Sequence, residues 1–302
     1  MYKKHTSGFE KWDQKHHAEE YLLFPENLGE TASLDETTFT YDELYTILTN
    51  KQGRAKNGSL VAMVHGTASK DIVSVFSKIP LEQREKVKEV TIDMARNMES
   101  AAKQLFTNAK IVTDRFHVVK LLLEVLQRVR VRYRWEAIDL ENEAIRLAKI
   151  NGIKYVPIVL QNGDTIKELL ARSRFLLFRN QAKWTDCQKE RALILFKNYP
   201  IIKQFYHFVL KFRNIYENIN KAHARFELKK WLDEAKCNAI PELSSFVNTI
   251  KYNFEKILNF FDNRNTNAFA ESFNSKIKHF RANLRGVKNM DFFLFRLTKL
   301  FA

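Results

Sequence analysis

The sequence predicts an α/β fold, in which a mixed five-stranded sheet with flanking helices carries a large all-helical insertion. Three observations lead to this prediction. Short β-rich runs and two helical patterns alternate through residues 31–117. From about residue 115 to the end, apolar residues recur every three to four positions, as they do in helices. Hydrophobic residues make up 45% of the 302 positions, which is enough to bury a core.

The predicted strands begin after residue 30. Residues 1–30 are polar and weakly periodic, and we expect them to form an arm with little structure of its own. Three runs typical of strands follow, SLDETTF, ELYTILTN and SLVAMVHGT, which begin at residues 33, 43 and 59. The segment KQGRAKNGS between the last two is typical of a hairpin turn. The three strands should therefore be neighbours and antiparallel.

Two helices and two further strands complete this region. ASKDIVSVFSKIP is predicted to be a helix that stops at Pro80. VKEVTIDMA, RNMESAAKQLF and AKIVTD follow as a strand, a helix and a strand. A meander followed by strands that are joined through helical crossovers is the order of an RNase H-like sheet.

The remainder of the chain is predicted to be helical. The clearest helical segments are 116–138, 166–180, 187–215 and 217–236. We therefore expect an N-terminal arm (1–30), the first part of an RNase H-like core (31–117), a helical insertion with basic helices (118–262), and a C-terminal helix that completes the core (263–302).

The charge of the chain indicates an anionic partner. Lys and Arg number 50 against 35 Asp and Glu, a net charge of +15. Residues 172–236 alone hold fifteen basic residues and six acidic ones. Each of these charges could simply be solvated on an ordinary helix. The local excess is harder to explain in that way, because like charges repel unless an anion neutralises them, and DNA is the leading candidate.

Several classes of protein are excluded by composition. The two cysteines, Cys187 and Cys237, are far apart, so neither a disulfide framework nor a cysteine-based zinc site is expected. No apolar run is long enough to span a membrane, and the first residues lack the apolar centre of a signal peptide. We expect a cytoplasmic protein that associates with the nucleoid and not with a membrane.

Two aspartates lie in or beside strand-like runs, where aspartate is depleted. Alternation places Asp35 on the face opposite Leu34 and turns Glu36, the competing carboxylate, away from it. Asp93 ends the run EVTID just before a predicted helix. Both residues have structural explanations as well, because Asp35 could bond a neighbouring loop and Asp93 could cap the helix.

A third carboxylate, Glu271, lies in the first turns of a helical pattern that is apolar on one side. The predicted buried stripe of this helix is Phe269, Phe273, Ile277, Phe280 and Leu284. Glu271, Asn274 and Lys278 project from another side, and the cations Lys276, Arg281 and Arg285 add to a basic surface that we expect to bind DNA. A glutamate in a first turn also favours the helix dipole, which needs no further function.

The three carboxylates suit a pair of metal ions. Mg²⁺ prefers oxygen ligands and keeps several waters, so Asp35, Asp93 and Glu271 together with substrate phosphates could hold two Mg²⁺, which Mn²⁺ could replace. Two ions about 4 Å apart can activate a nucleophile and stabilise the leaving oxygen of an in-line phosphoryl transfer.

Asp114 and His117 form a DxxH step at the end of the last predicted strand. This spacing can place both polar groups on one side of a helix start, where they could position a substrate. The structural alternative is that Asp114 caps the helix and that His117 is a partly buried packing residue.

With these residues identified, roughly residues 30–302 resemble the DDE transposases of bacterial insertion sequences. The segments that carry the resemblance are SLDETTF, VTIDMARNM, TDRFHVVKL and AESFNSKIK followed by the RG at 285–286. The resemblance is to the ISL3-type family, in its subgroup whose catalytic chain is encoded apart from a DNA-end-binding chain. It implies that Asp35, Asp93 and Glu271 form the catalytic triad, and that the helical insertion separates the fifth strand from the catalytic helix. Asp114 and His117 match a DxxH element of similar transposases.

The resemblance also carries expectations about partners. Full-length relatives begin with a cysteine-rich zinc element and a helix-turn-helix, and neither is found before Asp35. We therefore expect a separately encoded protein to recognise the element ends, and a homo-oligomer to assemble on DNA. The expected function is metal-dependent cleavage at transposon ends and strand transfer into target DNA. The alternatives are an RNase H-like nuclease or resolvase that only hydrolyses, and a DNA-binding relic without catalysis.

Overall fold

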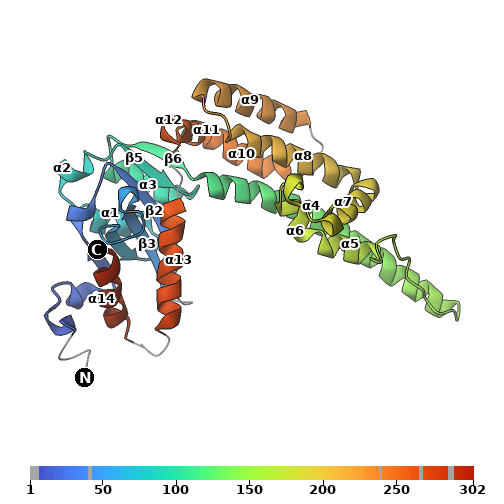
Figure 1. Cartoon of the computed structure of the whole chain (residues 1–302), viewed down its shortest axis with the longest axis horizontal. Coiled ribbons are helices and arrows are strands. Elements are labelled where there is room, and N and C mark those ends of the chain that lie inside the picture. Colours follow the sequence, from blue (N-terminus) through green and yellow to red (C-terminus); the bar gives the residue numbers. More distant parts are fainter. Residues whose placement is uncertain (1–6, 40–42, 238–239, 265–267, 285–288) are drawn as a thin grey trace. The chain divides into compact units, whose positions relative to one another are not determined.

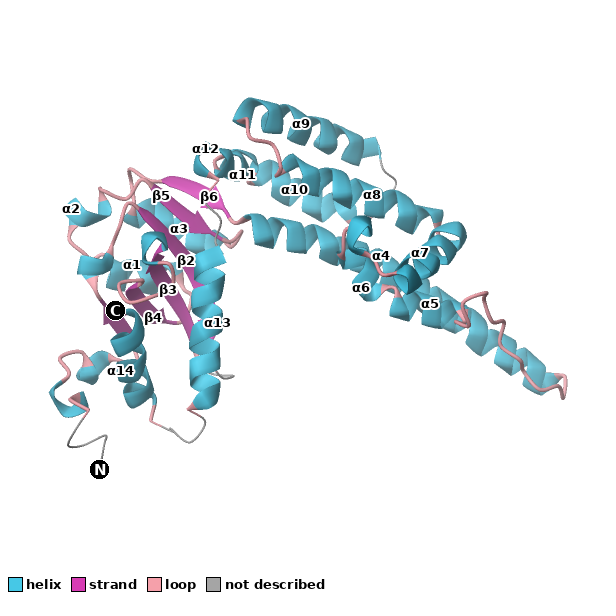
Figure 2. Ribbon diagram, in the orientation of Figure 1, coloured by secondary structure: helices cyan, strands magenta, loops and turns pink. Residues whose placement is uncertain are grey.

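The computed structural model describes residues 7–39, 43–237, 240–264, 268–284 and 289–302 (Figure 1). The chain divides into two compact units. The sheet unit consists of Met1–His117 and Asn253–Ala302, and the helical unit consists of Val118–Tyr252. Figure 2 shows all the strands in the first unit and only helices and loops in the second.

The sheet is mixed, as predicted, but it has six strands where we expected five. The strands are β1 (Tyr21–Leu23), β2 (Thr31–Thr38), β3 (Leu44–Asn50), β4 (Leu60–His65), β5 (Glu89–Ile92) and β6 (Lys110–Thr113). Their order is β1-β4-β3-β2-β5-β6. β2, β3 and β4 pair antiparallel as the predicted meander, and β5 and β6 extend the sheet from β2 in parallel.

The additional strand lies in the segment that we predicted to be an arm with little structure. β1 pairs antiparallel with β4, with Tyr21 opposite Val64, and Leu22 is fully buried. Before it, η2 (Phe9–Lys11) and η3 (Lys15–His17) are short 3₁₀ helices, and η4 (Pro25–Asn27) follows it. A strand of three residues has no detectable alternation of its own. Its position depends on the partner strand, which explains why the sequence did not predict it.

Two pairs of helices cover the sheet. α1 (Ser69–Phe76) and α3 (Arg96–Leu105) pack on the face that carries Leu34, Leu48 and Val90. α13 (Ala268–Asn283) and α14 (Met290–Phe301) pack on the other face against Ile47 and Met63. The short α2 (Leu81–Arg84) and η5 (Lys51–Gly53) lie in connections. The sheet is thus sandwiched between helices, as an α/β RNase H-like fold requires.

The stripe predicted for α13 is correct except at one position. Phe273 and Ile277 are buried against the sheet, and Phe280 and Leu284 pack partly against the same cluster. Phe269 was predicted to be buried and is 43% exposed, whereas Ala270 is buried. At the start of the helix the small residue faces the core, because positions 270, 273 and 277 are spaced by three and four residues.

In its described residues, the helical unit has six α-helices and most of a seventh. That seventh helix, α4 (Arg115–Ile150), starts in the sheet unit. The others are α5 (Ile166–Arg172), α6 (Arg174–Phe178), α7 (Asp186–Asn198), α8 (Pro200–Ile215), α9 (Lys221–Cys237) and α10 (Leu243–Tyr252). A short 3₁₀ helix, η6 (Gln181–Lys183), precedes α7. The predicted segment 187–215 is two helices, because Pro200 cannot continue α7 and instead begins α8.

The helical insertion is shorter than predicted at its C-terminal end. We placed its end at residue 262, but the helical unit ends at Tyr252. α11 (Phe254–Leu258) and α12 (Phe260–Asn263) belong to the sheet unit. The Asn259 amide donates to the Ile111 carbonyl at 3.0 Å, and Lys256 pairs with Glu99. These contacts attach the segment to β6 and α3.

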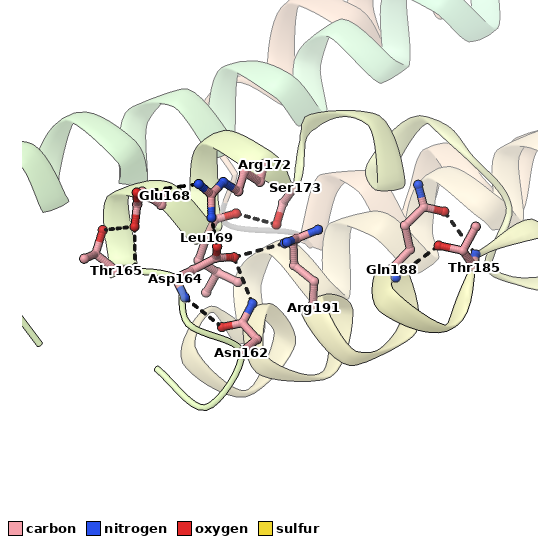
Figure 3. A network of polar contacts seen from close by, with 10 residues as sticks. All are labelled: Asn162, Asp164, Thr165, Glu168, Leu169, Arg172, Ser173, Thr185, Gln188 and Arg191. Atoms are coloured by element: carbon pink, nitrogen blue, oxygen red, sulfur yellow. Dashed lines mark hydrogen bonds and ion pairs between the residues drawn. The ribbon is translucent and has the colours of Figure 1, made fainter. Parts of the chain in front are cut away.

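A buried carboxylate stabilises the helical unit near α5 and α7. Asp164 is 1% exposed and accepts hydrogen bonds from Arg172, Arg191 and Asn162 (Figure 3). Thr165 begins α5 with a reciprocal capping box to Glu168. Among the residues that the structure describes, no helix is long and apolar enough to cross a membrane.

Candidate active site

Three aspartates directly follow residues that are in register on three neighbouring parallel strands. In the parallel part of the sheet, Leu34 of β2 is in register with Ile92 of β5, which is in register with Thr113 of β6. The next residue in each chain segment is Asp35, Asp93 or Asp114. Because the strands run in the same direction, the three aspartates share one edge of the sheet.

A backbone amide fixes one oxygen of each of these aspartates. The amide of Glu36 donates to Asp35 Oδ1 at 2.8 Å, and that of Ala95 donates to Asp93 Oδ1 at 2.8 Å. The amide of Phe116 donates to Asp114 Oδ1 at 3.1 Å. The bond of Asp114 reaches the second residue of α4, so Asp114 caps this helix, as we considered. Asp93 bonds Ala95, which itself holds the N-cap position of α3 and leaves that helix without a side-chain cap. These backbone bonds orient the three carboxylates at the sheet edge.

Helix α13 brings the fourth carboxylate to this edge. Asp35 lies opposite Ile47, and cross-strand partners share a face, so Asp35 is on the side of the sheet that α13 covers. Asn274 Nδ2 donates to Asp35 Oδ2 at 2.7 Å across 239 residues of sequence. Glu271 is three residues before Asn274 in α13, so both side chains project from one side of the helix.

Burial and neighbouring carboxylates raise the pKa values of two acids in this site, Asp35 and Glu271. The pKa of Asp35 is raised to about 6: burial is the main cause and the charges of Asp93 and Asp114 add to it, whereas the Glu36 amide and His117 lower it. Burial also raises the pKa of Glu271, and Asp114 contributes, while His117 opposes the change. A concentration of carboxylates at a sheet edge is therefore costly without a cation.

Asp114 and His117 belong to this cluster. His117 Nε2 is 3.7 Å from Asp114 Oδ2, and Asp114 is 3% exposed. The charges of Asp114 and His117 act on the pKa of Glu271, so the DxxH pair lies near α13. Glu36, on the opposite face of β2, is half-buried, and burial followed by the charge of Asp93 raises its pKa.

The chemistry of the donors fits divalent metal ions. Carboxylate oxygens are the ligands that Mg²⁺ and Mn²⁺ prefer. The raised pKa of Asp35 shows a side chain that a cation would stabilise in its charged form. Within the described residues, however, no three His, Cys, Asp or Glu side chains are drawn together closely enough to ligate one ion. The carboxylates are gathered at one edge and are not arranged in a coordination sphere.

The cations predicted to bind DNA have different surroundings. Lys276 Nζ donates to the Ala55 carbonyl at 2.7 Å, and Arg281 pairs with Glu43 at 3.0 Å while lying over the Phe293 ring. Lys278 is exposed. Asn274, which we also predicted to contact DNA, bonds Asp35. Arg285 lies outside the described residues.

Sequence reasoning missed a buried ion pair in the same unit. Lys51 Nζ contacts Glu89 Oε1 at 3.1 Å and Thr91 Oγ1 at 2.7 Å, and Asn263 Nδ2 donates to Glu89 Oε2 at 3.1 Å. Glu89 is the first residue of β5 and alternates in face with Val90, which was the only available signal. The pair joins η5, which directly follows β3, to β5 and the end of α12.

Comparisons with known proteins relate the chain to transposases. The transposase for insertion sequence element IS1001 of Bordetella parapertussis is 25% identical over 230 residues, which cover 75% of this chain and 50% of that protein. The chain thus spans about half the length of this curated relative. No solved structure matches the chain.

The family assignment rests on a match over most of the chain. The model of a transposase family, the ISL3-type DDE transposases, matches residues 33–297. These residues include β2, β5, β6, α13 and all four carboxylates of the sheet edge. The chain belongs to the ISL3-type DDE transposase family.

Proposed function

We propose that this chain cleaves DNA phosphodiesters at the ends of an insertion sequence and joins the freed ends to target DNA, in a reaction that depends on divalent metal ions. The observation that supports the proposal most strongly is the convergence of four carboxylates. Asp35, Asp93 and Asp114 come from adjacent strands, and the Asn274 bond to Asp35 brings Glu271 of α13 to the same edge.

Asp35, Asp93 and Glu271 would hold two Mg²⁺ ions, and Mn²⁺ could replace them. When bound, such ions polarise the phosphate and lower the pKa of a coordinated water. Burial among like charges prepares Asp35 for this role, because it makes the unoccupied site unfavourable. Asn274 orients Asp35 through its 2.7 Å bond, and the Glu36 amide holds the other oxygen.

In the proposed first step, water attacks the phosphorus at the element end, and the bond to the 3′ oxygen of the element breaks to leave a 3′-OH. In the second step this hydroxyl attacks a target phosphodiester and displaces a 3′ oxygen of the target. The two steps break and form the same kind of bond, so one site can serve both.

The chain's own polar groups would position the DNA. His117, held beside Asp114 at 3.7 Å, can donate an N–H to a phosphate oxygen near the reacting bond. Exposed Lys278, seven residues after Glu271 on the same side of α13, can contact the neighbouring backbone. We further propose that a separately encoded protein reads the sequence of the element ends and that the chain acts as a homo-oligomer on DNA.

A nicking and strand-transfer assay tests this function. Labelled DNA from the ends of the element is incubated with the chain in Mg²⁺ or Mn²⁺, with and without the product of any small neighbouring reading frame. We expect 3′-OH formation and joined products, and a loss of about a thousandfold or more in Glu271→Gln. Glu82→Gln, an exposed glutamate of α2, is the matched control and should retain activity.

Each other outcome has a clear meaning. Metal-dependent joining that persists in Glu271→Gln would contradict the assignment of Glu271. Cleavage without joined products would indicate the hydrolytic nuclease, and DNA binding without any cleavage, even with the partner, would indicate the non-catalytic relic.

A further inference from the structure

A groove of about 730 Å³ in the helical unit lies along α4 and α6. Residues at helical spacing on α4 form one side of it, and Arg174 and Phe178 of α6 form the other. The α4 residues in this lining are Lys120, Glu124, Gln127, Arg128, Arg130, Val131, Arg132 and Trp135. Most of them project from the side of α4 opposite its buried stripe, which includes Leu122, Val125 and Val129.

Two of the five cations in the groove are used by the protein itself. Arg130 is buried and donates to the Leu170 carbonyl at 2.8 Å and to Gln127 at 2.6 Å. Arg132 pairs with Glu242 at 2.8 Å and with Glu136 at 3.4 Å. These two arginines are bonded within the protein and form part of the groove lining.

The other three cations, Lys120, Arg128 and Arg174, are exposed, and within the described part of the chain no ion pair engages them. Glu124 is the one acidic residue in the lining. Burial lowers the pKa of Arg130, and the charges of Arg134 and Arg174 lower it further, which shows how closely cations gather here. The groove therefore has an excess of positive charge that an anion would neutralise.

An exposed tryptophan lies at the end of this row of cations. Trp135 is 60% exposed, although a large indole is normally buried in a monomeric protein. By the rise of an α-helix, Arg128 is about 12 Å from Lys120 along the axis, and Trp135 is about 10 Å further. Phosphate-binding cations and an exposed aromatic ring thus follow one another along the groove.

We propose that this groove binds an unpaired DNA strand, with its phosphates on Lys120, Arg128 and Arg174 and with one base stacked on Trp135. In a duplex the faces of the bases are stacked and inaccessible, so a site for duplex DNA needs only cations that contact its phosphates. An exposed aromatic ring beside the cations is what a site for unpaired bases requires. The inference rests on the proposed function only in taking DNA as the polyanion.

The test measures binding by the full chain in EDTA, so that no cleavage occurs. The probes are a fluorescein-labelled oligo(dT) strand and a labelled hairpin duplex of equal length. We expect Trp135→Leu to weaken binding of the single strand about tenfold and to change duplex binding by less than about twofold. Phe226→Leu, an equally exposed aromatic on α9, is the matched control and should change neither.

Tryptophan fluorescence provides a second readout that is independent of the label. The chain has 4 tryptophans, and we expect oligo(dT) to quench the wild type and the control but not Trp135→Leu. Arg128→Ala should weaken both probes and lower the slope of log affinity against log salt by about 0.7 for the single strand. Lys229→Ala on α9 is the matched cation control.

Two results would overturn the proposal. One is an unchanged affinity and unchanged quenching of the single strand in Trp135→Leu, provided that its melting temperature equals that of the wild type. The other is an equal loss of affinity for the single strand and the duplex in Trp135→Leu, which would indicate a groove that contacts only the DNA backbone. Neither result depends on cleavage, so failure of the groove and failure of Glu271→Gln to abolish cleavage would be separately visible.

Discussion

Asp164 in the helical unit is buried and Asp35 in the sheet unit is partly buried, and the two aspartates have opposite surroundings. In the helical unit, burial would raise the pKa of Asp164, but hydrogen bonds from Arg191, Arg172 and Asn162 outweigh burial and lower it (Figure 3). In the sheet unit, burial together with the charges of two other aspartates raises the pKa of Asp35 to about 6, although His117 and the Glu36 amide lower it. Asn274, its side-chain partner, carries no charge.

This difference is the one expected between a structural carboxylate and the functional one that we propose for Asp35. A buried charge that the fold itself neutralises stabilises the structure and has no capacity left for a ligand. A carboxylate that is buried among like charges costs stability, and it is retained where a cation or a substrate supplies the compensation. The sheet unit does contain a buried lysine, Lys51, but that lysine pairs with Glu89.

The largest effect on stability is expected from the helical unit. Asp164→Asn removes the charge that Arg172 and Arg191 share, and we expect a loss of about 2 kcal/mol in the free energy of unfolding. The loss stays below that of a fully buried pair because the Arg172 side chain is 54% exposed. Urea unfolding measures it, and Asp186→Asn, an exposed ion-paired aspartate of α7, is the control. An unchanged unfolding midpoint would show that the network is not structural.

A smaller effect, on the cleavage rate, is expected at the sheet edge that carries Asp35. Asn274→Ala frees one oxygen of Asp35, and we expect the single-turnover cleavage rate to fall about tenfold with the fold retained. Asn283→Ala, an exposed amide near the other end of α13, provides the comparison. Equal rates for the two variants would remove Asn274 from the site.

The smallest expected effect is on the pH dependence of the unfolding free energy, to which Asp35 and Asp164 should contribute with opposite signs. The folded pKa of Asp35, about 6, is above its ordinary value of 3.8, so its contribution to stability is present below pH 3.8 and is lost as the pH rises through 6. In EDTA, the unfolding free energy of the wild type should fall by about 1 kcal/mol relative to Asp35→Asn between pH 4 and pH 7, which is less than the whole shift would give because solvent screens the partly exposed Asp35.

For Asp164 the folded pKa is lowered, so the stability it contributes is present above pH 3.8 and is lost as the pH falls through the folded pKa. The wild type should therefore lose its advantage over Asp164→Asn only in acid. A pH dependence of the same sign for both aspartates would contradict the distinction between the two units.

The features that depend on local pattern could be predicted from the sequence. Alternation in β2 and β5 and the order of strands and helices predicted the mixed sheet, and the positions of Asp35 within β2 and of Asp93 directly after β5 follow from that order. Asp114 could be placed at the end of a strand but not beside Glu271, because that proximity depends on how α13 packs on the sheet.

The features that depend on long-range packing could not be predicted. β1 has three residues and exists because β4 offers an edge. Lys276 was interpreted as a DNA contact, yet its ammonium group reaches the Ala55 carbonyl across 221 residues of sequence. The periodicity of α13 does not show which of its lysines contacts the loop before β4. It also does not show that Asn274 bonds Asp35.

The central claim is that the carboxylates of the sheet edge bind divalent metal ions, and localised cleavage of the protein chain tests it most directly. Fe²⁺ binds oxygen ligands and, with ascorbate and peroxide, generates radicals that cut the polypeptide close to the bound ion. We predict fragments that end near residues 35, 93, 114 and 271, suppressed by excess Mg²⁺ and by Asp35→Asn but not by Asp164→Asn. Cuts confined to other positions, or the same cuts in Asp35→Asn, would contradict the account.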